Sequence, residues 1–288
     1  MQRLKCFSQN YSAMCDATGI DAVKTAAITL NGVTKSFKDG TKVLLDFSFH
    51  VLAGSICAIM GPSGCGKSSL LRVIAGLHKP DNVSSVSVFG ESPRDMLRAG
   101  KTSLLSSDSA LLPWRSAIDN VRLPLDLLGL ERCSATDRSL ELIRRMRLDK
   151  LKNMRPHELS DGQRQRLRLA QALVTYPSLI LLDEPFSAVD EGLRSILINE
   201  IGEYLTITNP GSTAIFVTHH SVEAAMLADR VVCVDGSPVE LKPIHIVNDI
   251  QIVVPKKERD DIYIYNKGSE ICKILVNNSN GTESSVMV

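Results

Sequence analysis

The segment from Gly61 to Ser68 has residue types and a spacing that can hold a phosphate group. It fits the pattern G-x-x-x-x-G-K-[ST] at each fixed position. A short apolar run precedes it and a helix-compatible run follows it, so a strand, a glycine loop and a helix start are expected in succession. Backbone N–H groups at a helix start bind anions. The residues expected to cradle phosphate are Gly61, Pro62, Ser63, Gly64, Cys65, Gly66, Lys67, Ser68 and Ser69.

Two carboxylates supply what such a loop lacks. Asp183 and Glu184 follow the apolar run at residues 178–182. A carboxylate at the carboxyl end of a buried parallel strand reaches the ligand crevice of an α/β sheet. We therefore expect Lys67 to contact the β- and γ-phosphates of a nucleotide and Ser68 and Asp183 to hold Mg²⁺. Glu184 is expected to polarise the water that attacks the γ-phosphate.

His219 ends the next apolar run, at residues 214–218, and is expected near the same crevice. There it could hydrogen-bond the γ-phosphate. The alternatives are a structural histidine and, for Asp183 and Glu184, a pair of acids that cap a turn. The phosphate loop favours the functional interpretation of all three residues. His220 is expected to point away from the crevice if the chain is extended, so it has no assigned role; adjacent histidines also make a poor metal pair.

The composition is that of an ordinary globular protein of 288 residues, with 44% hydrophobic and 23% charged residues. The net charge of +1 gives no electrostatic reason to expect a nucleic-acid partner. No run approaches the 18 or so apolar residues of a membrane span, and the start lacks the apolar core of a signal peptide. Seven dispersed cysteines are typical of reduced thiols in a cytoplasm.

The order of the patterns predicts an α/β fold: a P-loop NTPase with a mostly parallel sheet, an antiparallel β subdomain and an inserted helical subdomain. Residues 1–25 show no periodicity and are expected to be a poorly ordered extension. The main domain is expected over residues 26–245, with its helical subdomain at about 108–176. Alternation of apolar and polar residues after residue 245 predicts a small β-rich appendage over residues 246–288.

A further motif, Leu-Ser-Asp-Gly-Gln-Arg-Gln-Arg at residues 159–166, resembles the signature of ATP-binding-cassette (ABC) ATPases, usually L-S-G-G-Q. The resemblance spans about residues 26–240 and includes the phosphate loop, the Asp183 strand end, residues 187–190 and residues 217–219. It implies that Ser160, Gly162 and Gln163, at the start of a helix, contact ATP bound by a second copy of the chain. Their backbone donors and the helix dipole would face that nucleotide.

The same resemblance implies two further roles. Phe37 lies where the family has an aromatic residue that stacks on adenine, and the alternative is a core phenylalanine at a turn. Residues 111–121, which include Trp114, are similar to a segment of nitrate, sulfonate and taurine importers that adjoins the membrane subunit. An exposed tryptophan there would suit a partner's helix. The alternative is that Trp114 packs in the core of this chain.

The function implied is that of an ATP-hydrolysing subunit of an importer, bound peripherally at the cytoplasmic face of the inner membrane. Its partners would be a second identical subunit, membrane permease subunits and, indirectly, a solute-binding protein. Its substrate would be a small solute of the nitrate, sulfonate or taurine kind, although this subunit does not itself contact the solute. The alternatives are a non-transport ABC protein and a regulatory ATP-dependent clamp with weak turnover.

Two positions depart from the family pattern. Ser107 stands where glutamine is usual, and its shorter side chain could reach the metal or the attacking water only through a bridging water. Slow hydrolysis is therefore expected. Asp161 stands where glycine is usual, and its carboxylate would repel a phosphate unless it turns to solvent.

Overall fold

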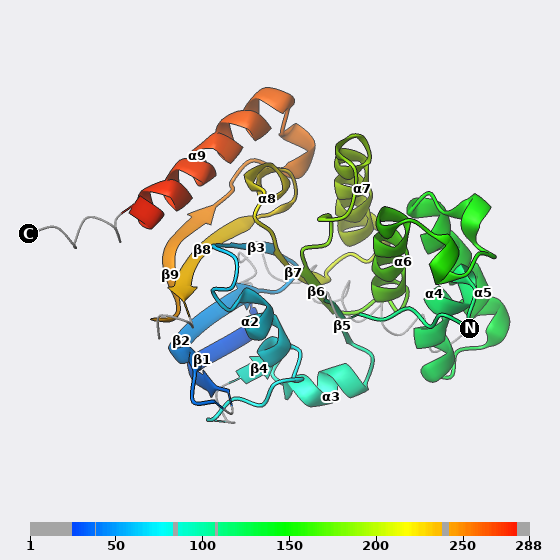
Figure 1. Cartoon of the computed structure of the whole chain (residues 1–288), viewed down its shortest axis with the longest axis horizontal. Coiled ribbons are helices and arrows are strands. Elements are labelled where there is room, and N and C mark those ends of the chain that lie inside the picture. The colour runs from blue at the N-terminus through cyan, green and yellow to red at the C-terminus, as the bar shows by residue number, and fades with distance from the viewer. Residues whose placement is uncertain (1–24, 38, 83–85, 107–108, 238–241, 281–288) are drawn as a thin grey trace, which may run out of the picture.

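The computed structural model describes residues 25–37, 39–82, 86–106, 109–237 and 242–280. Within them one mixed sheet runs in the order β4-β1-β2-β9-β8-β3-β7-β6-β5 (Figure 1). The strands are β1 (Ala26–Ser36), β2 (Lys42–Leu52), β3 (Ile56–Met60), β4 (Val86–Val88), β5 (Thr102–Leu105), β6 (Leu179–Asp183), β7 (Thr213–Val217), β8 (Arg230–Ser237) and β9 (Lys242–Gln251). The helices are α2 (Lys67–Ile74), α3 (Pro93–Arg98), α4 (Ala117–Leu127), α5 (Arg132–Arg145), α6 (Asp161–Leu173), α7 (Glu191–Glu203), α8 (Ser221–Leu227) and α9 (Asp261–Asn280).

The parallel strands β8, β3, β7, β6 and β5 are consecutive and form one side of the sheet, with β5 as the edge strand. Every residue of β3 and β7 is buried, as expected for parallel strands that are covered on both faces. Asp183, the last residue of β6, pairs with Val217, the last residue of β7. The carboxyl ends of these strands therefore open on one edge of the sheet, where ligands bind in such folds.

The antiparallel part consists of three strands: β1 lies in the middle and pairs with β2 on one side and with β4 on the other. Strand β9 joins the two parts, because it runs antiparallel to β8 and contacts β2 in parallel at Leu44 and Ile244. A mostly parallel sheet with an antiparallel β part and a helical insertion is the predicted architecture, and the prediction of fold class is confirmed.

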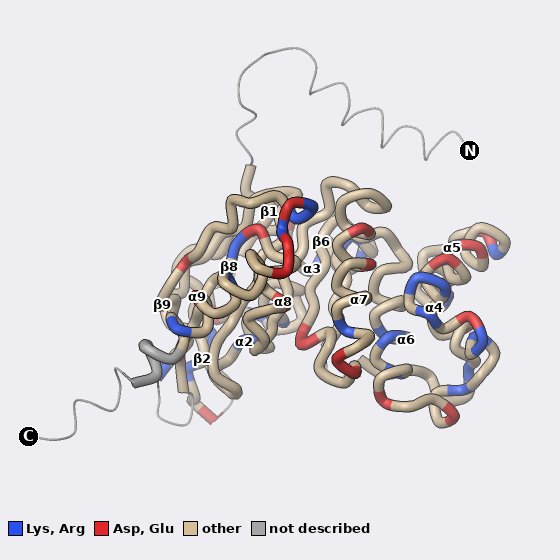
Figure 2. The backbone as a smooth tube through the Cα atoms, turned by 90° about the horizontal axis from the view of Figure 1, so that it is seen from above, with Lys and Arg blue, Asp and Glu red and all other residues tan. Residues whose placement is uncertain are grey.

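The helices α4, α5 and α6 lie between β5 and β6 in the chain and pack against one another. They form the part of the molecule farthest from α9 (Figure 1). Seen from above, this group carries many of the Lys and Arg residues (Figure 2). The start of α6, and with it the signature motif, is thereby carried on a helical arm beside the sheet.

The predicted β-rich appendage at residues 246–288 is wrong for most of the described segment. Only its first residues are a strand, the end of β9, and residues 261–280 form helix α9. The helix packs on α8, with Ile271 fully buried and Gly268 against Val222. Packing against α8 outweighs the β-propensity of its isoleucines and tyrosines.

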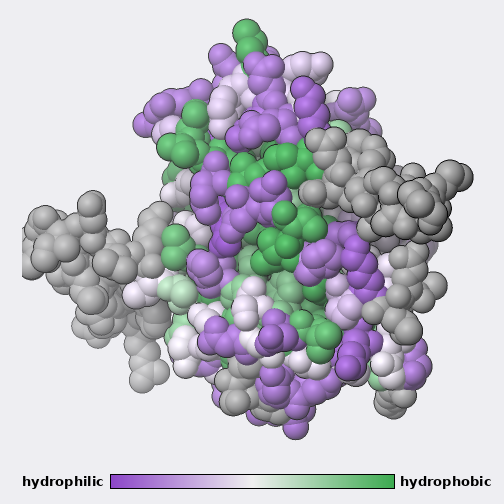
Figure 3. All heavy atoms as spheres, turned by 90° about the vertical axis from the view of Figure 1, so that its left-hand side faces the viewer, coloured by the Kyte–Doolittle hydropathy of each residue, from purple (hydrophilic) through white to green (hydrophobic). Residues whose placement is uncertain are grey.

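The guanidinium group of Arg259 fixes the start of this C-terminal segment. It donates to the carbonyl oxygens of Ala225, Met226 and Ala228, at the end of α8. On the face that bears α9 and β9, hydrophobic side chains lie at the surface between hydrophilic ones (Figure 3). Ile262 and Tyr265, on α9, are exposed.

The predicted extension over residues 1–25 lies outside the described residues except for Thr25. In the part of the chain that the structure covers, no helix combines the length and the apolar character needed to cross a membrane.

Candidate nucleotide-binding site

The phosphate loop connects β3 to α2, as the sequence predicts. Gly66 caps α2 with φ 112°, and a Cβ atom there would lie 2.7 Å from Cγ1 of Val43, so only glycine fits. Lys67 is 6% exposed, and its ammonium donates to the carbonyl oxygens of Gly61, at 2.9 Å, and Pro62, at 2.6 Å. The positive charge therefore lies over the loop, where a phosphate would bind.

Ser68 and Asp183 meet, as a metal site would require. The hydroxyl of Ser68 lies beside the Asp183 carboxylate and acts to lower its pKa. Burial raises the pKa of Asp183, and the Ser68 hydroxyl and the charges of Arg72 and Lys67 oppose that rise. No group of three or more His, Cys, Asp or Glu ligands gathers among the described residues. One hydroxyl and one carboxylate fit Mg²⁺, which takes few protein ligands and completes its shell with phosphate and water.

Glu184 and His219 also lie together. Nδ1 of His219 is 3.6 Å from Oε1 of Glu184, and both side chains are half-exposed. Glu184 has φ 47°, unusual for a residue with a side chain, and its backbone N–H donates to the Val217 carbonyl across the ends of β6 and β7. Such strain is typical of functional sites. A carboxylate and an imidazole thus face each other beside the metal site.

The signature residues begin α6. Ser160 caps the helix: its hydroxyl accepts from the Gln163 N–H, and its own N–H donates to Gln163 Oε1 at 2.9 Å. A Cβ atom at Gly162 would lie 2.8 Å from the carbonyl oxygen of Ala188, so glycine allows the helix start to approach residues 187–190. Asp161 is turned to solvent and pairs with Arg164, so its carboxylate would not repel a phosphate at the helix start.

Phe37 lies beyond the end of β1, in the hairpin to β2. Its ring is 39% exposed and stands edge-on to His78, with 5.9 Å between centroids. The hairpin adjoins the phosphate loop through Val43, which contacts Gly66. A role in stacking on adenine stays a prediction for Phe37.

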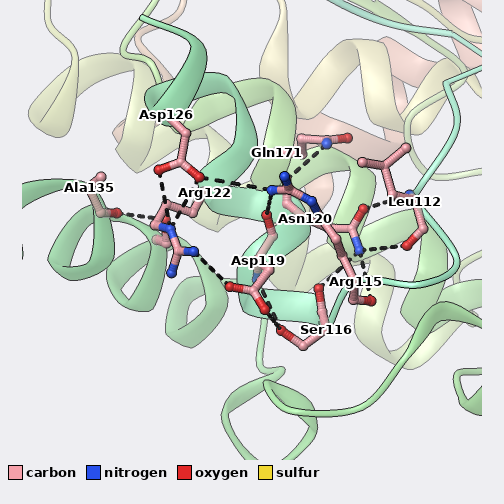
Figure 4. Close-up of polar contacts among 10 residues, drawn as sticks. Leu112, Arg115, Ser116, Asp119, Asn120, Arg122, Asp126, Ala135 and Gln171 are labelled. Carbon is pink, nitrogen blue, oxygen red and sulfur yellow. Dashed lines mark hydrogen bonds and ion pairs between the residues drawn. The ribbon is translucent and has the colours of Figure 1, made fainter. Parts of the chain in front are cut away.

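Trp114 lies in the turn before α4. Asn120 bonds to residues on both sides of this turn, Leu112, Arg115 and Ser116 (Figure 4). Asn120 is fully buried; its Oδ1 accepts from the Leu112 N–H at 2.7 Å, and its Nδ2 lies within 3.2 Å of the carbonyl oxygens of Leu112, Arg115 and Ser116. Gln171, on α6, donates to the Asn120 carbonyl. Trp114 itself is 69% exposed, so the alternative that it packs in the core is wrong.

Gln165 also belongs to this site, although no sequence motif assigned it a role. This residue lies on the buried face of α6, and its Nε2 is 3.2 Å from the Pro185 carbonyl oxygen and 3.4 Å from that of Glu184. It ties the signature helix to the turn that bears Glu184. The sequence does contain one indication of its burial. Gln165 precedes Leu169 and Leu173 at intervals of four residues, so it is a polar residue on the otherwise apolar face of the helix. Ser107, where the family pattern breaks, lies outside the described residues.

Comparison with known proteins agrees with this geometry. The family model described as "ABC transporter" matches residues 44–187. An aliphatic sulfonates import ATP-binding protein of Rhizobium johnstonii is 35% identical over 247 residues, which are 85% of this chain and 84% of that protein. A spermidine/putrescine import ATP-binding protein of Treponema pallidum is 36% identical over 231 residues, which are 76% of this chain. Only 59% of the polyamine protein is covered, so the chain spans little more than half of that relative's length.

The fold is also found in solved structures. A dimeric ATP-binding cassette in a post-hydrolysis state, bound to ADP and Pi, matches with a TM-score of 0.69 and 26% sequence identity. The match covers 79% of this chain and all of that one. Together with the relatives and the family model, it shows that this chain belongs to the ABC transporter family.

Proposed function

We propose that this chain binds ATP with Mg²⁺, hydrolyses it and acts as the ATP-binding subunit of an importer. The observation that carries the proposal is the meeting of four groups at one edge of the sheet: the Lys67 ammonium, the Ser68–Asp183 pair, the Glu184 carboxylate and the His219 imidazole. The similarity to import ATP-binding proteins for sulfonates and polyamines supports the assignment to import.

Each of these groups has a separate task in the proposed mechanism. The loop N–H groups and Lys67 bind the β- and γ-phosphates. Ser68 and Asp183 would hold Mg²⁺, which supplies positive charge to the phosphate oxygens when bound. Glu184 accepts a proton from the attacking water, and its half-exposed carboxylate leaves room for that water. His219, within reach of Glu184, donates a hydrogen bond to the γ-phosphate.

Steady-state phosphate release from the purified chain tests this proposal. We expect ATP hydrolysis that disappears when EDTA removes Mg²⁺ and returns when Mg²⁺ is added in excess. A slow but measurable rate is expected, because Ser107 replaces the family's glutamine. The assay is run at several ATP concentrations, with the chain alone and with a membrane fraction that contains its permease. If no hydrolysis is found in either case, the proposed ATPase activity is refuted and a regulatory ATP-dependent clamp is favoured.

The proposed assembly is a homodimer that encloses ATP between two copies of the chain. The exposed start of α6 supports it, because the backbone N–H groups of residues 161 and 162 and the positive end of the helix lie on the helical arm and not in the chain's own phosphate loop. ATP would then link Ser160, Gly162 and Gln163 of one subunit to the phosphate loop of the other. A solved neighbour of this fold is itself dimeric.

The oligomeric state should therefore depend on the nucleotide. In a Glu184→Gln variant, which retains ATP, we expect a dimer with ATP and a monomer with ADP, because only ATP brings a γ-phosphate to the partner's α6. Size-exclusion chromatography with light scattering measures both states. A monomer with every nucleotide would contradict the sandwich.

The turn at residues 113–115, which carries Trp114, is the proposed contact with a membrane permease. A large exposed aromatic side chain on a turn that is fixed by Asn120 is preorganised for binding, which lowers the entropic cost of association. Leu127, at the end of α4, is 78% exposed and adds apolar surface to the same arm. Through this contact the chain would lie peripherally on the cytoplasmic face of the inner membrane. A solute-binding protein would deliver a small solute of the sulfonate or taurine kind to that permease.

A further inference from the structure

A buried carboxylate lies behind the proposed catalytic pair and has no part in the mechanism above. Glu223, on α8, is four residues beyond His219 and only 3% exposed. Its Oε2 accepts a hydrogen bond of 2.5 Å from the hydroxyl of Thr218. Burial raises the pKa of Glu223, while the Thr218 hydrogen bond and the charge of Arg194 oppose the rise. One carboxylate oxygen is therefore fixed by the Thr218 hydrogen bond, while Oε1 has no hydrogen-bond partner among the described residues and interacts with Arg194 by charge alone.

The second partner, Arg194, comes from the neighbouring helix α7. Its Nε lies 3.7 Å from Oε1 of Glu223. Its Nη2 donates to the carbonyl oxygen of Val189 at 3.2 Å. Val189 belongs to residues 187–190, the segment that Gly162 of α6 also approaches. Arg194 therefore connects this segment to the buried carboxylate.

These contacts close a ring around the site. On one side, Ser187 donates from its N–H and its hydroxyl to the carbonyl oxygen of Glu184, which ties residues 187–190 to the catalytic turn. On the other side, the hydroxyl of Thr218 accepts from the His220 N–H at 3.0 Å, so the peptide on both sides of His219 is fixed. The 3.6 Å contact between His219 and Glu184 completes the ring.

We infer that Glu223, Arg194 and Thr218 are positioning residues that fix His219 relative to Glu184. Through the same contacts, the position of His219 is coupled to the position of residues 187–190. The inference rests on the proposed function, since it assigns these three residues a task in the same reaction. A buried ion pair is weak evidence for a role in stability, because packed apolar residues of similar size often serve stability as well or better. Positioning, in contrast, needs directional bonds, and the Thr218–Glu223 and Arg194–Val189 hydrogen bonds supply them.

The test compares two substitutions of Thr218 in purified full-length protein. Thr218→Val has the shape of threonine but no hydroxyl, whereas Thr218→Ser keeps the hydroxyl. We expect Thr218→Val to lower kcat for ATP hydrolysis about 10- to 100-fold, the effect of a displacement of roughly 1 Å in a catalytic group, with little change in KM. Thr218→Ser should retain kcat within a factor of about three, an allowance for the lost methyl group.

Glu223→Gln provides the second measurement. The glutamine can still accept from Thr218, but it carries no charge to orient Arg194, so we expect an intermediate loss of kcat and again little change in KM. Thermal unfolding of each variant, followed by circular dichroism, shows whether it is folded at the assay temperature. If Thr218→Val does not fold, Glu223→Gln decides the question.

Two results would overturn the inference. One is a folded Thr218→Val or Glu223→Gln with the kcat of the wild type. The other is a loss of kcat in Thr218→Ser as large as in Thr218→Val, because the hydroxyl would then not be the group that matters. The wild-type protein in the same assay tests the proposed function by its own turnover, and only the ratios between variants test the positioning role.

Discussion

Replacing Glu184 with glutamine is expected to lower the rate of ATP hydrolysis by about 10²–10⁴-fold, the usual contribution of a positioned general base. The carboxylate is half-exposed and held in a strained backbone conformation, so it is presented to a water rather than used in packing. Glutamine has the same shape but cannot take the proton. ATP affinity should change little, because the phosphate contacts belong to the loop. Phosphate release and isothermal titration calorimetry measure the two quantities.

The matched control is Glu203→Gln, the same substitution at an exposed position at the end of α7. It should hydrolyse ATP at the wild-type rate. If Glu184→Gln also did so, another group would have to activate the water, and the assignment of Glu184 would be wrong.

Replacing Lys67 with alanine is expected to weaken ATP binding on the order of 100-fold, within the range for losing one or two hydrogen bonds to a charged group. The ammonium of Lys67 is nearly buried and already directed to the loop carbonyls of Gly61 and Pro62. A bound phosphate would meet this charge in a site with little water, where the interaction is strong. Titration with a fluorescent ATP analogue measures the affinity.

Lys101→Ala is the control for Lys67, because Lys101 is a partly exposed lysine that pairs with Glu91 at 3.2 Å. Its ATP affinity should equal that of the wild type. Thermal unfolding of Lys67→Ala must also be measured, since Lys67 bridges two loop carbonyls and its loss could loosen the loop. Wild-type affinity in a folded Lys67→Ala protein would contradict the role given to this residue.

The sequence was most informative where the chemistry is local. The phosphate loop needs only consecutive residues, because the N–H groups that bind an anion and the glycines that allow their geometry lie within one turn of chain. The cap of α6 is equally local: Ser160 and Gln163 bond to each other across three residues. The strand ends at Asp183 and His219 could be placed near the loop because parallel strands open on one edge.

Contacts between residues far apart in the sequence could not be predicted from local sequence motifs. Gln165 and Glu223 are ordinary polar residues in the sequence, and only folding brings Gln165 to the Pro185 carbonyl and Glu223 to Arg194. The C-terminal segment illustrates the same limit. Its isoleucines and tyrosines favour a strand, but burial of Ile271 against α8 and the hold of Arg259 on the end of α8 make it a helix.

The sequence by itself thus determined the fold class, the phosphate loop and the identities of the candidate catalytic groups, because period, spacing and capping express local energies. The tertiary structure decided how those groups face one another: the contact of His219 with Glu184, the burial of Glu223 and the exposure of Trp114. The physical reason is that burial and electrostatic contact depend on which distant segments share the same space. No local pattern encodes that choice, whereas packing of the whole chain imposes it.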